Sequence, residues 1–89
     1  MNQNILFADL QMWDQNKQAV NFPAQQAGAL ITCWVSLHWL QQQSSVVLTN
    51  EAEILSAFTA NRFDLEELAE ALIEDEMFND DGDVVIDVD

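Results

Sequence analysis

The chain has 89 residues, a net charge of −14 and a hydrophobic fraction of 49%, with three tryptophans and five phenylalanines. This length predicts a single domain, 1–89, and the aromatic content argues against an intrinsically disordered chain. Two cations are too few to neutralise several phosphates, so the composition excludes nucleic acid as a partner.

The first predicted strand is the apolar run 4–8, in which Ile5 and Phe7 share one face. Asp9 follows this run, and we expect its carboxylate to cap a brief turn over 10–13. A short polar turn then leads to the next strand.

Residues 18–24 and 29–36 are predicted as the second and third strands, joined into a hairpin by a turn at 25–28. Successive side chains of a strand point to opposite faces of its sheet. One face of the third strand is entirely apolar and is expected to pack against helices, which directs Trp34 to the opposite face. The apolar face consists of Ala29, Ile31, Cys33 and Val35.

The segment after the hairpin starts with a short predicted helix. Ser36 is a candidate N-cap for this helix, which carries Trp39 and Leu40. The rest of 38–48 stays open, because 46–48 fits either a strand fragment or an apolar connector.

A clearer helix start lies at Asn50. Asn50 followed three residues later by Glu53 is close to a capping box and predicts a helix over 51–60. Ile54 and Phe58 would lie on its buried face.

The strongest periodicity in the chain predicts a second long helix over 65–77. Asp64 followed by Glu67 has the capping-box spacing, and Phe63 and Leu68 have the spacing of a hydrophobic staple. The apolar positions of this helix recur at helical spacing. They are Leu65, Leu68, Ala69, Leu72 and Ile73.

The last predicted element is a strand over 84–88, after a turn at 80–82, with an acidic outer face. The predicted fold class is therefore α+β. We expect a small two-layer domain in which a short antiparallel sheet packs against the two long helices.

The acidic residues are concentrated in 51–89, which holds fourteen of the sixteen carboxylates and one cation, Arg62. Three glutamates of the long helix would stand one turn apart as a ridge, and like charges at this spacing destabilise a helix. A basic protein partner would relieve this repulsion, although a solvated face held by packing on the opposite side explains the same pattern. The predicted partner-binding residues are Glu66, Glu70, Glu74 and Trp34.

A first alternative is a small ligand-binding or enzymatic domain. Its pocket would lie near Trp34, which would cover an open sheet face together with Trp13 or Trp39. A nearby acid such as Asp14 would then take part in the site. A second small core beneath the N-terminal turn is the competing explanation for these tryptophans.

A second alternative is weak divalent-cation binding at the acidic segment 74–83. An EF-hand loop with its glycine at Gly82 would run from Met77 to Val88, and both end positions require an acidic ligand that the sequence does not supply. A turn with diffuse attraction for cations fits this segment better.

The remaining chemistry-bearing residues predict no catalytic site, metal or cofactor. Cys33 is the only cysteine and His38 the only histidine, so neither an internal disulfide nor a zinc-ligand set is predicted. Cys33 alternates into an apolar face and is expected to be a buried thiol. No signal-peptide pattern and no apolar run of about 18 residues is present, which predicts a cytoplasmic protein with no membrane partner.

Several short motifs are spread over nearly the whole chain. They are Met1-Asn2-Gln3, Ile5, Phe7, Trp13-Asp14, Val20, Phe22-Pro23-Ala24, Gly28, Cys33, Phe58, Arg62-Phe63-Asp64, Glu67, Ala69 and Ile73. As a set they resemble the YrdB-like family of small bacterial proteins, which is domain of unknown function 1488. The resemblance implies a small α+β domain with a short antiparallel sheet packed against helices. It implies no activity and no catalytic residue.

The expected function is that of a cytoplasmic, non-enzymatic interaction protein that presents an acidic surface to a basic partner. Binding through exposed charge should weaken steeply as the salt concentration rises.

Overall fold

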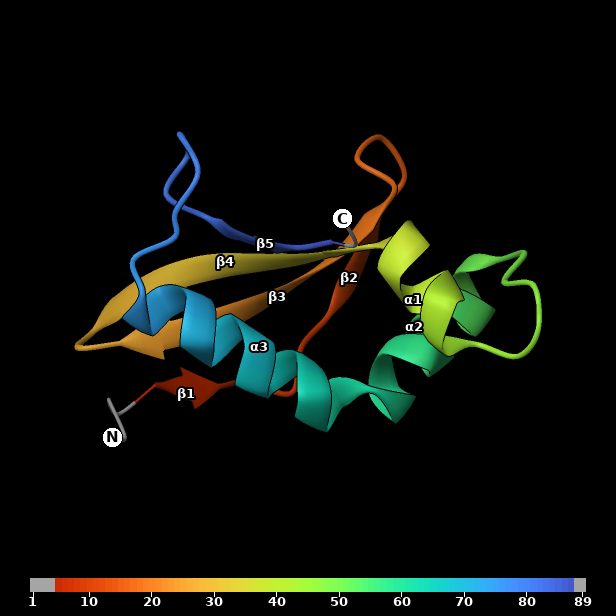
Figure 1. The fold of residues 1–89 in the computed structure, drawn as a ribbon, viewed down its shortest axis with the longest axis horizontal. Helices are drawn as coiled ribbons and strands as arrows, with labels where there is room; N and C mark the ends of the chain where they lie inside the picture. Colours follow the sequence, from red (N-terminus) through yellow and green to blue (C-terminus); the bar gives the residue numbers. More distant parts are fainter. Residues whose placement is uncertain (1–4, 88–89) are drawn as a thin grey trace.

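The computed structural model describes residues 5–87, which form a five-stranded sheet and three helices. The elements in chain order are β1 (Leu6–Phe7), β2 (Met12–Asp14), β3 (Ala19–Gln26), β4 (Ala29–Ser36), α1 (Leu37–Gln43), α2 (Glu51–Ala60), α3 (Arg62–Glu74) and β5 (Val84–Ile86). Figure 1 shows α3 below β3, β4 and β5, with α1 and α2 at the right-hand end of these strands. The predicted two-layer α+β fold is confirmed.

The centre of the sheet is the antiparallel hairpin of β3 and β4, which pair along their whole length. Ala27 and Gly28 form its turn, with φ angles of 53° and 84°. Two consecutive positive φ angles are typical of a type I′ turn, whose twist matches that of the flanking strands. Strand 29–36 has its predicted bounds. The predicted bounds of strand 18–24 and of the turn 25–28 are wrong, because β3 continues to Gln26 and only Ala27 and Gly28 form the turn. Val20 and Phe22 of β3 are buried.

Both β1 and β2 pair with the remaining edge of β3. The pairing is interrupted at 8–11, opposite Phe22 and Pro23, and Pro23 has no backbone N–H to offer a neighbouring strand. The prediction that Asp9 caps a turn over 10–13 is wrong, because β2 begins at Met12. Pairing with β3 outweighs the local capping signal, since strand formation depends on cross-strand neighbours.

Strand β5 completes the sheet beside β4 and runs parallel to it, so the sheet is mixed, whereas an antiparallel sheet was expected. Parallel neighbours require a crossover connection, and the three helices supply it by carrying the chain back across one face. Val84 and Ile86 are buried and Val85 is exposed, as the predicted alternation requires. Asn4 and Val88, the outer ends of the predicted strands 4–8 and 84–88, lie outside the described residues.

The starts of α1 and α2 confirm the predicted caps. The Ser36 hydroxyl accepts a hydrogen bond from the N–H of Trp39 at 2.9 Å, and Asn50 Oδ1 accepts one from the N–H of Glu53 at 2.9 Å. The segment 44–50 between the helices is a connector. The side-chain amide of Gln41 holds the backbone of this connector by donating a hydrogen bond to the carbonyl of Val46.

Helix α3 begins at Arg62 and ends at Glu74, so the predicted bounds 65–77 are wrong at both ends. The predicted staple is also absent, because Phe63 and Leu68 are 83% and 41% exposed. Only Asn61 separates α3 from α2, and its side chain bonds the carbonyl of Ala57 instead of capping α3. Because α3 already begins at Arg62, Asp64 lies inside its first turn and is not its N-cap.

The end of α3 has the hydrogen bonds of a Schellman motif. The N–H of Met77 bonds the Leu72 carbonyl at 2.9 Å, and the N–H of Glu76 bonds the Ile73 carbonyl at 3.0 Å. Glu76 has a φ of 57°, the left-handed conformation that this motif normally assigns to glycine. The turn ends the helix three residues earlier than its sequence pattern suggests.

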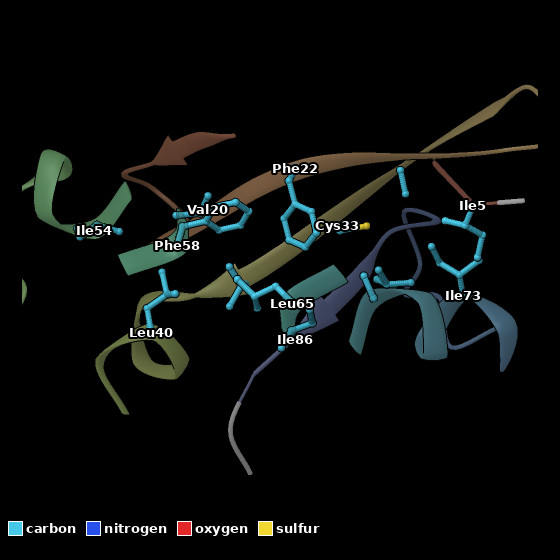
Figure 2. Packing of buried hydrophobic residues seen from close by; sticks show 14 residues of the cluster. Ile5, Val20, Phe22, Cys33, Leu40, Ile54, Phe58, Leu65, Ile73 and Ile86 are labelled. Atoms are coloured by element: carbon cyan, nitrogen blue, oxygen red, sulfur yellow. The ribbon is translucent and has the colours of Figure 1, made fainter. Parts of the chain in front are cut away.

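The core lies between the inner face of the sheet and the helices (Figure 2). The Phe22 ring from β3 meets the Phe58 ring from α2 edge to face, with centroids 5.1 Å apart. Cys33 and Leu65 are fully buried beside them, and no described buried residue is polar or charged. None of the described helices has both the length and the apolar character needed to cross a membrane.

Candidate functional site

The two faces of the sheet differ in what covers them. The inner face packs against the helices, whereas within residues 5–87 no helix covers the outer face (Figure 1). Trp34 lies on the outer face, as predicted, because its neighbours Cys33 and Val35 are both buried in the core. The described residues therefore leave the outer face of the sheet accessible to other molecules.

One part of the outer face is apolar. Four large side chains there are exposed, and Leu30 is 76% exposed. They surround Pro23 and line two adjoining depressions of about 370 Å³ and 160 Å³ that share Leu10 and Pro23. We call this surface the apolar patch. It consists of Leu6, Leu10, Met12 and Leu30.

A groove of about 250 Å³ forms the other part of the outer face. It lies between the β2–β3 turn and the segment that precedes β5, both of which project away from α3 in Figure 1. Trp34 belongs to this groove, which we call the tryptophan groove. Its lining residues are Lys17, Ala19, Trp34, Ser36, Asn79, Asp81, Asp83, Val85 and Asp87.

Opposite charges meet on the Trp34 side chain. Its indole Nε1–H donates to Asp83 Oδ2 at 2.9 Å, and the Lys17 ammonium lies 5.2 Å from the ring centroid. The hydrogen bond fixes the orientation of the ring, while the ring face attracts a cation. The groove thus presents an aromatic surface bordered by carboxylates.

The acidic wall of the groove is a folded loop. Asn79 Oδ1 accepts hydrogen bonds from the N–H groups of Asp81 and Asp83, at 2.9 and 3.0 Å. The N–H of Asn79 donates to the Asp83 carbonyl at 2.8 Å, and Gly82 adopts a φ of 81°. These bonds set the positions of the two aspartates relative to Trp34.

Ser36 links the groove to α1. Its hydroxyl donates to the carboxylate of Asp87 while it accepts the N–H of Trp39. The N-cap of α1 and the end of β5 therefore share one side chain.

The predicted glutamate ridge lies on α3, which packs on the inner face of the sheet, so the structure does not bring it to Trp34. Glu66 accepts a hydrogen bond from Arg62 Nε at 2.8 Å and is partly buried. Glu70 is also partly buried, and Glu74 is exposed. The predicted site residues thus belong to two separate surfaces.

The guanidinium of Arg62 makes its contacts within the fold. Its Nη1 donates to Gln11 Oε1 at 2.8 Å and its Nη2 donates to the Ala8 carbonyl, while Nε binds Glu66. These contacts connect the start of α3 to the segment 8–11 between β1 and β2.

The prediction that Trp13 or Trp39 shares the open face with Trp34 is wrong, because both pack against the core. Trp13 pairs with Val20, whose side chain faces inward. Asp14, the acid proposed beside the tryptophans, accepts the backbone N–H of Lys17 at 2.9 Å and so holds the β2–β3 turn.

Cys33 is fully buried, as predicted. Burial, and in second place the charge of Asp83, raise the pKa of its thiol to about 12, so the reactive thiolate does not form at neutral pH. His38 is exposed and lies 3.4 Å from the Gln42 amide. Among residues 5–87, no three His, Cys, Asp or Glu side chains come together in a way that could hold a metal ion.

Sequence reasoning missed Lys17, Asp83 and Asp87 as groove residues. Asp83 and Asp87 could have been placed from the alternation around Val85, since all three share a face with Trp34. No sequence signal places Lys17 against Trp34, because that contact depends on how the β2–β3 turn leans over the sheet.

A family model described as protein of unknown function (DUF1488) matches residues 5–86. The uncharacterized protein YrdB of Escherichia coli (strain K12) is 39% identical over 82 residues, which cover 92% of this chain and 94% of that protein. The uncharacterized protein YrdB of Shigella flexneri is 38% identical over the same shares of both chains. A crystal structure of a DUF1488 protein of unknown function from Shewanella loihica PV-4 superimposes with a TM-score of 0.92 at 38% identity, covering 97% of this chain and 94% of that one.

Proposed function

The chain belongs to the DUF1488 family of proteins of unknown function, and on that premise we propose that it is a non-enzymatic protein that binds a basic partner protein through the outer face of its sheet. The observation that carries the proposal is the apolar patch. Large apolar side chains gathered on one uncovered face are typical of an interaction surface.

The charge of the chain supports a basic partner. The net charge is −14, and both cations already have partners within the chain: Lys17 lies over Trp34, and Arg62 binds Glu66. Carboxylates at the tryptophan groove lie on the same face as the apolar patch. A segment with both apolar and basic side chains would therefore match this face in both respects.

The same charge disfavours a second copy of the chain as the occupant. Two protomers meeting through their outer faces would bring together two molecules that each carry a net charge of −14, with the groove aspartates near the contact. A partner of opposite charge meets no such repulsion.

The proposal is tested by affinity capture from native lysate at low salt with three baits. These are the parent protein, Leu30→Ser in the apolar patch, and Val47→Ser, which alters an exposed apolar residue in the connector between α1 and α2. We expect a basic protein that binds the parent and the Val47→Ser bait, is lost with Leu30→Ser, and dissociates as salt rises. Partners that are mainly acidic, or that bind all three baits equally, would overturn the proposal.

A further inference from the structure

We infer that the tryptophan groove receives one lysine or arginine side chain of the partner and that Lys17 occupies it as an internal stand-in. This inference rests on the proposed function, since it names the chemistry that the outer face recognises. The contact that motivates it is the Lys17 ammonium 5.2 Å from the centroid of the Trp34 ring. A cation already occupies the place where the inferred ligand would bind.

The surroundings of Trp34 favour a cation over any other ligand charge. Asp83 holds the indole N–H at 2.9 Å, and Asp81 and Asp87 line the same groove. A cation above the ring is attracted both by the π face and by these carboxylates, whereas an anion is repelled by them. The ligand class is therefore an alkylammonium or a guanidinium.

The size of the groove favours a side chain over a larger molecule. Its volume is about 250 Å³, below the range of roughly 300–1,000 Å³ typical of pockets for cofactors and drug-sized ligands. Apolar atoms of Ala19 and Val85 line it beside the charged groups. The aliphatic stem of lysine or arginine can lie on such atoms while its charged end meets the carboxylates.

The Lys17 side chain can leave without unfolding its turn. The Asp14 carboxylate accepts the backbone N–H of Lys17 at 2.9 Å, and the Gln18 side chain donates to the Gln15 carbonyl at 2.8 Å. Both bonds are independent of the Lys17 ammonium, and the residue itself is exposed. An incoming basic side chain would thus displace only the ammonium.

The test uses three small probes and the full-length protein: N-acetyl-lysine methylamide, N-acetyl-arginine methylamide and the uncharged N-acetyl-norleucine methylamide. Binding is followed through the indole Nε1–H signal of Trp34 in ¹H–¹⁵N spectra, which Trp34→Phe identifies. We expect saturable shifts with the two cationic probes and none with norleucine. The inference would be overturned by shifts of equal size with the norleucine probe. It would also be overturned if neither cationic probe gave a saturable shift, in the parent protein or in the Lys17→Ala variant described next.

Two variants separate displacement from general attraction. Lys17→Ala should tighten binding of the cationic probes by about two- to fivefold, since a cation on an exposed aromatic face contributes 0.5–1 kcal/mol. Gln43→Glu makes the same change in net charge at an exposed position of α1 and should leave the affinity of the cationic probes unchanged. Equal effects of both variants, or weaker binding with Lys17→Ala, would contradict a stand-in role.

Failure of this inference is distinguishable from failure of the proposed function. Leu30→Ser should abolish partner capture while leaving the probe affinities unchanged, because Leu30 does not line the tryptophan groove. If the cationic probes do not bind but a partner is still captured in a Leu30-dependent way, only the inference is overturned. Probe binding without any partner that depends on Leu30 would overturn the proposed function alone.

Discussion

The guanidinium carbon of Arg62 lies 5.4 Å from the centroid of the Phe58 ring, so a cation covers a fully buried aromatic side chain of the core. The same guanidinium binds Gln11 and the Ala8 carbonyl in the segment between β1 and β2. Asp9 stands 3.8 Å from it but is almost fully exposed, so that ion pair adds little. One side chain thus joins the sheet edge, α3 and the core.

Replacing Arg62 by lysine should lower the free energy of unfolding by about 1–3 kcal/mol. Lysine cannot reproduce the fork of donors that reaches Gln11, Ala8 and Glu66 together, and hydrogen bonds to charged groups contribute in this range. Urea unfolding measures the change. Glu66→Gln retains an acceptor and should cost less, whereas Arg62→Lys with parental stability would contradict the structural role.

Replacing Glu76 by glycine should raise the free energy of unfolding by about 1 kcal/mol. Glu76 adopts a φ of 57°, and an L side chain in this conformation costs roughly 1–2 kcal/mol that glycine avoids. Part of this gain is offset because glycine loses more conformational entropy on folding. Glu76→Gln removes the charge and keeps the conformation, so it separates the two effects. Equal stabilisation by both substitutions would show that charge and not backbone strain is responsible.

Stability should fall as the pH rises above 9, in part because of Cys33. Its thiol pKa is about 12 in the folded chain against an ordinary value of 9.0, so between these values the unfolded chain releases the proton and the folded chain retains it. The contribution is complete below pH 9 and is lost toward pH 12, at up to about 1.4 kcal/mol per pH unit. Unfolding free energies of the parent and Cys33→Ala, measured from pH 8 to 11, should diverge in slope. Parallel curves would refute the assignment.

The hairpin turn offers a matched pair of substitutions. Gly28→Ala should destabilise the protein by about 1–2 kcal/mol through backbone strain alone, since a Cβ there meets no atom within 4 Å and φ is 84°. Ala27→Asn should be stabilising by a few tenths of a kcal/mol, because asparagine followed by glycine favours the type I′ turn. Thermal unfolding that moves both variants in the same direction would argue against this turn type.

The elements that the sequence predicts well are those determined by neighbouring residues. Strand 29–36 follows from its one entirely apolar face and a glycine turn, and the starts of α1 and α2 follow from Ser36 and Asn50. The outward direction of Trp34 follows from the alternation of side chains along this strand. Each of these signals acts over a few residues, so the rest of the fold does not change it.

The elements that the sequence predicts poorly depend on distant contacts. The three residues of β2 form a strand only because β3 offers them an edge, and α3 begins at Arg62, which contacts the β1–β2 segment. The parallel direction of β5 depends on where the helices return the chain. The tryptophan groove needs Lys17 and Asp83 from two separate loops, which no local pattern connects.

The placement of β5 has a consequence for folding kinetics. Trp34 and Asp83, which meet where β5 joins β4, are 49 residues apart, whereas the β3–β4 hairpin closes across a two-residue turn. Chain entropy penalises the closure of long loops before their contacts form, and non-local pairing slows folding. The hairpin can therefore form early, and the groove is completed only when the last strand docks.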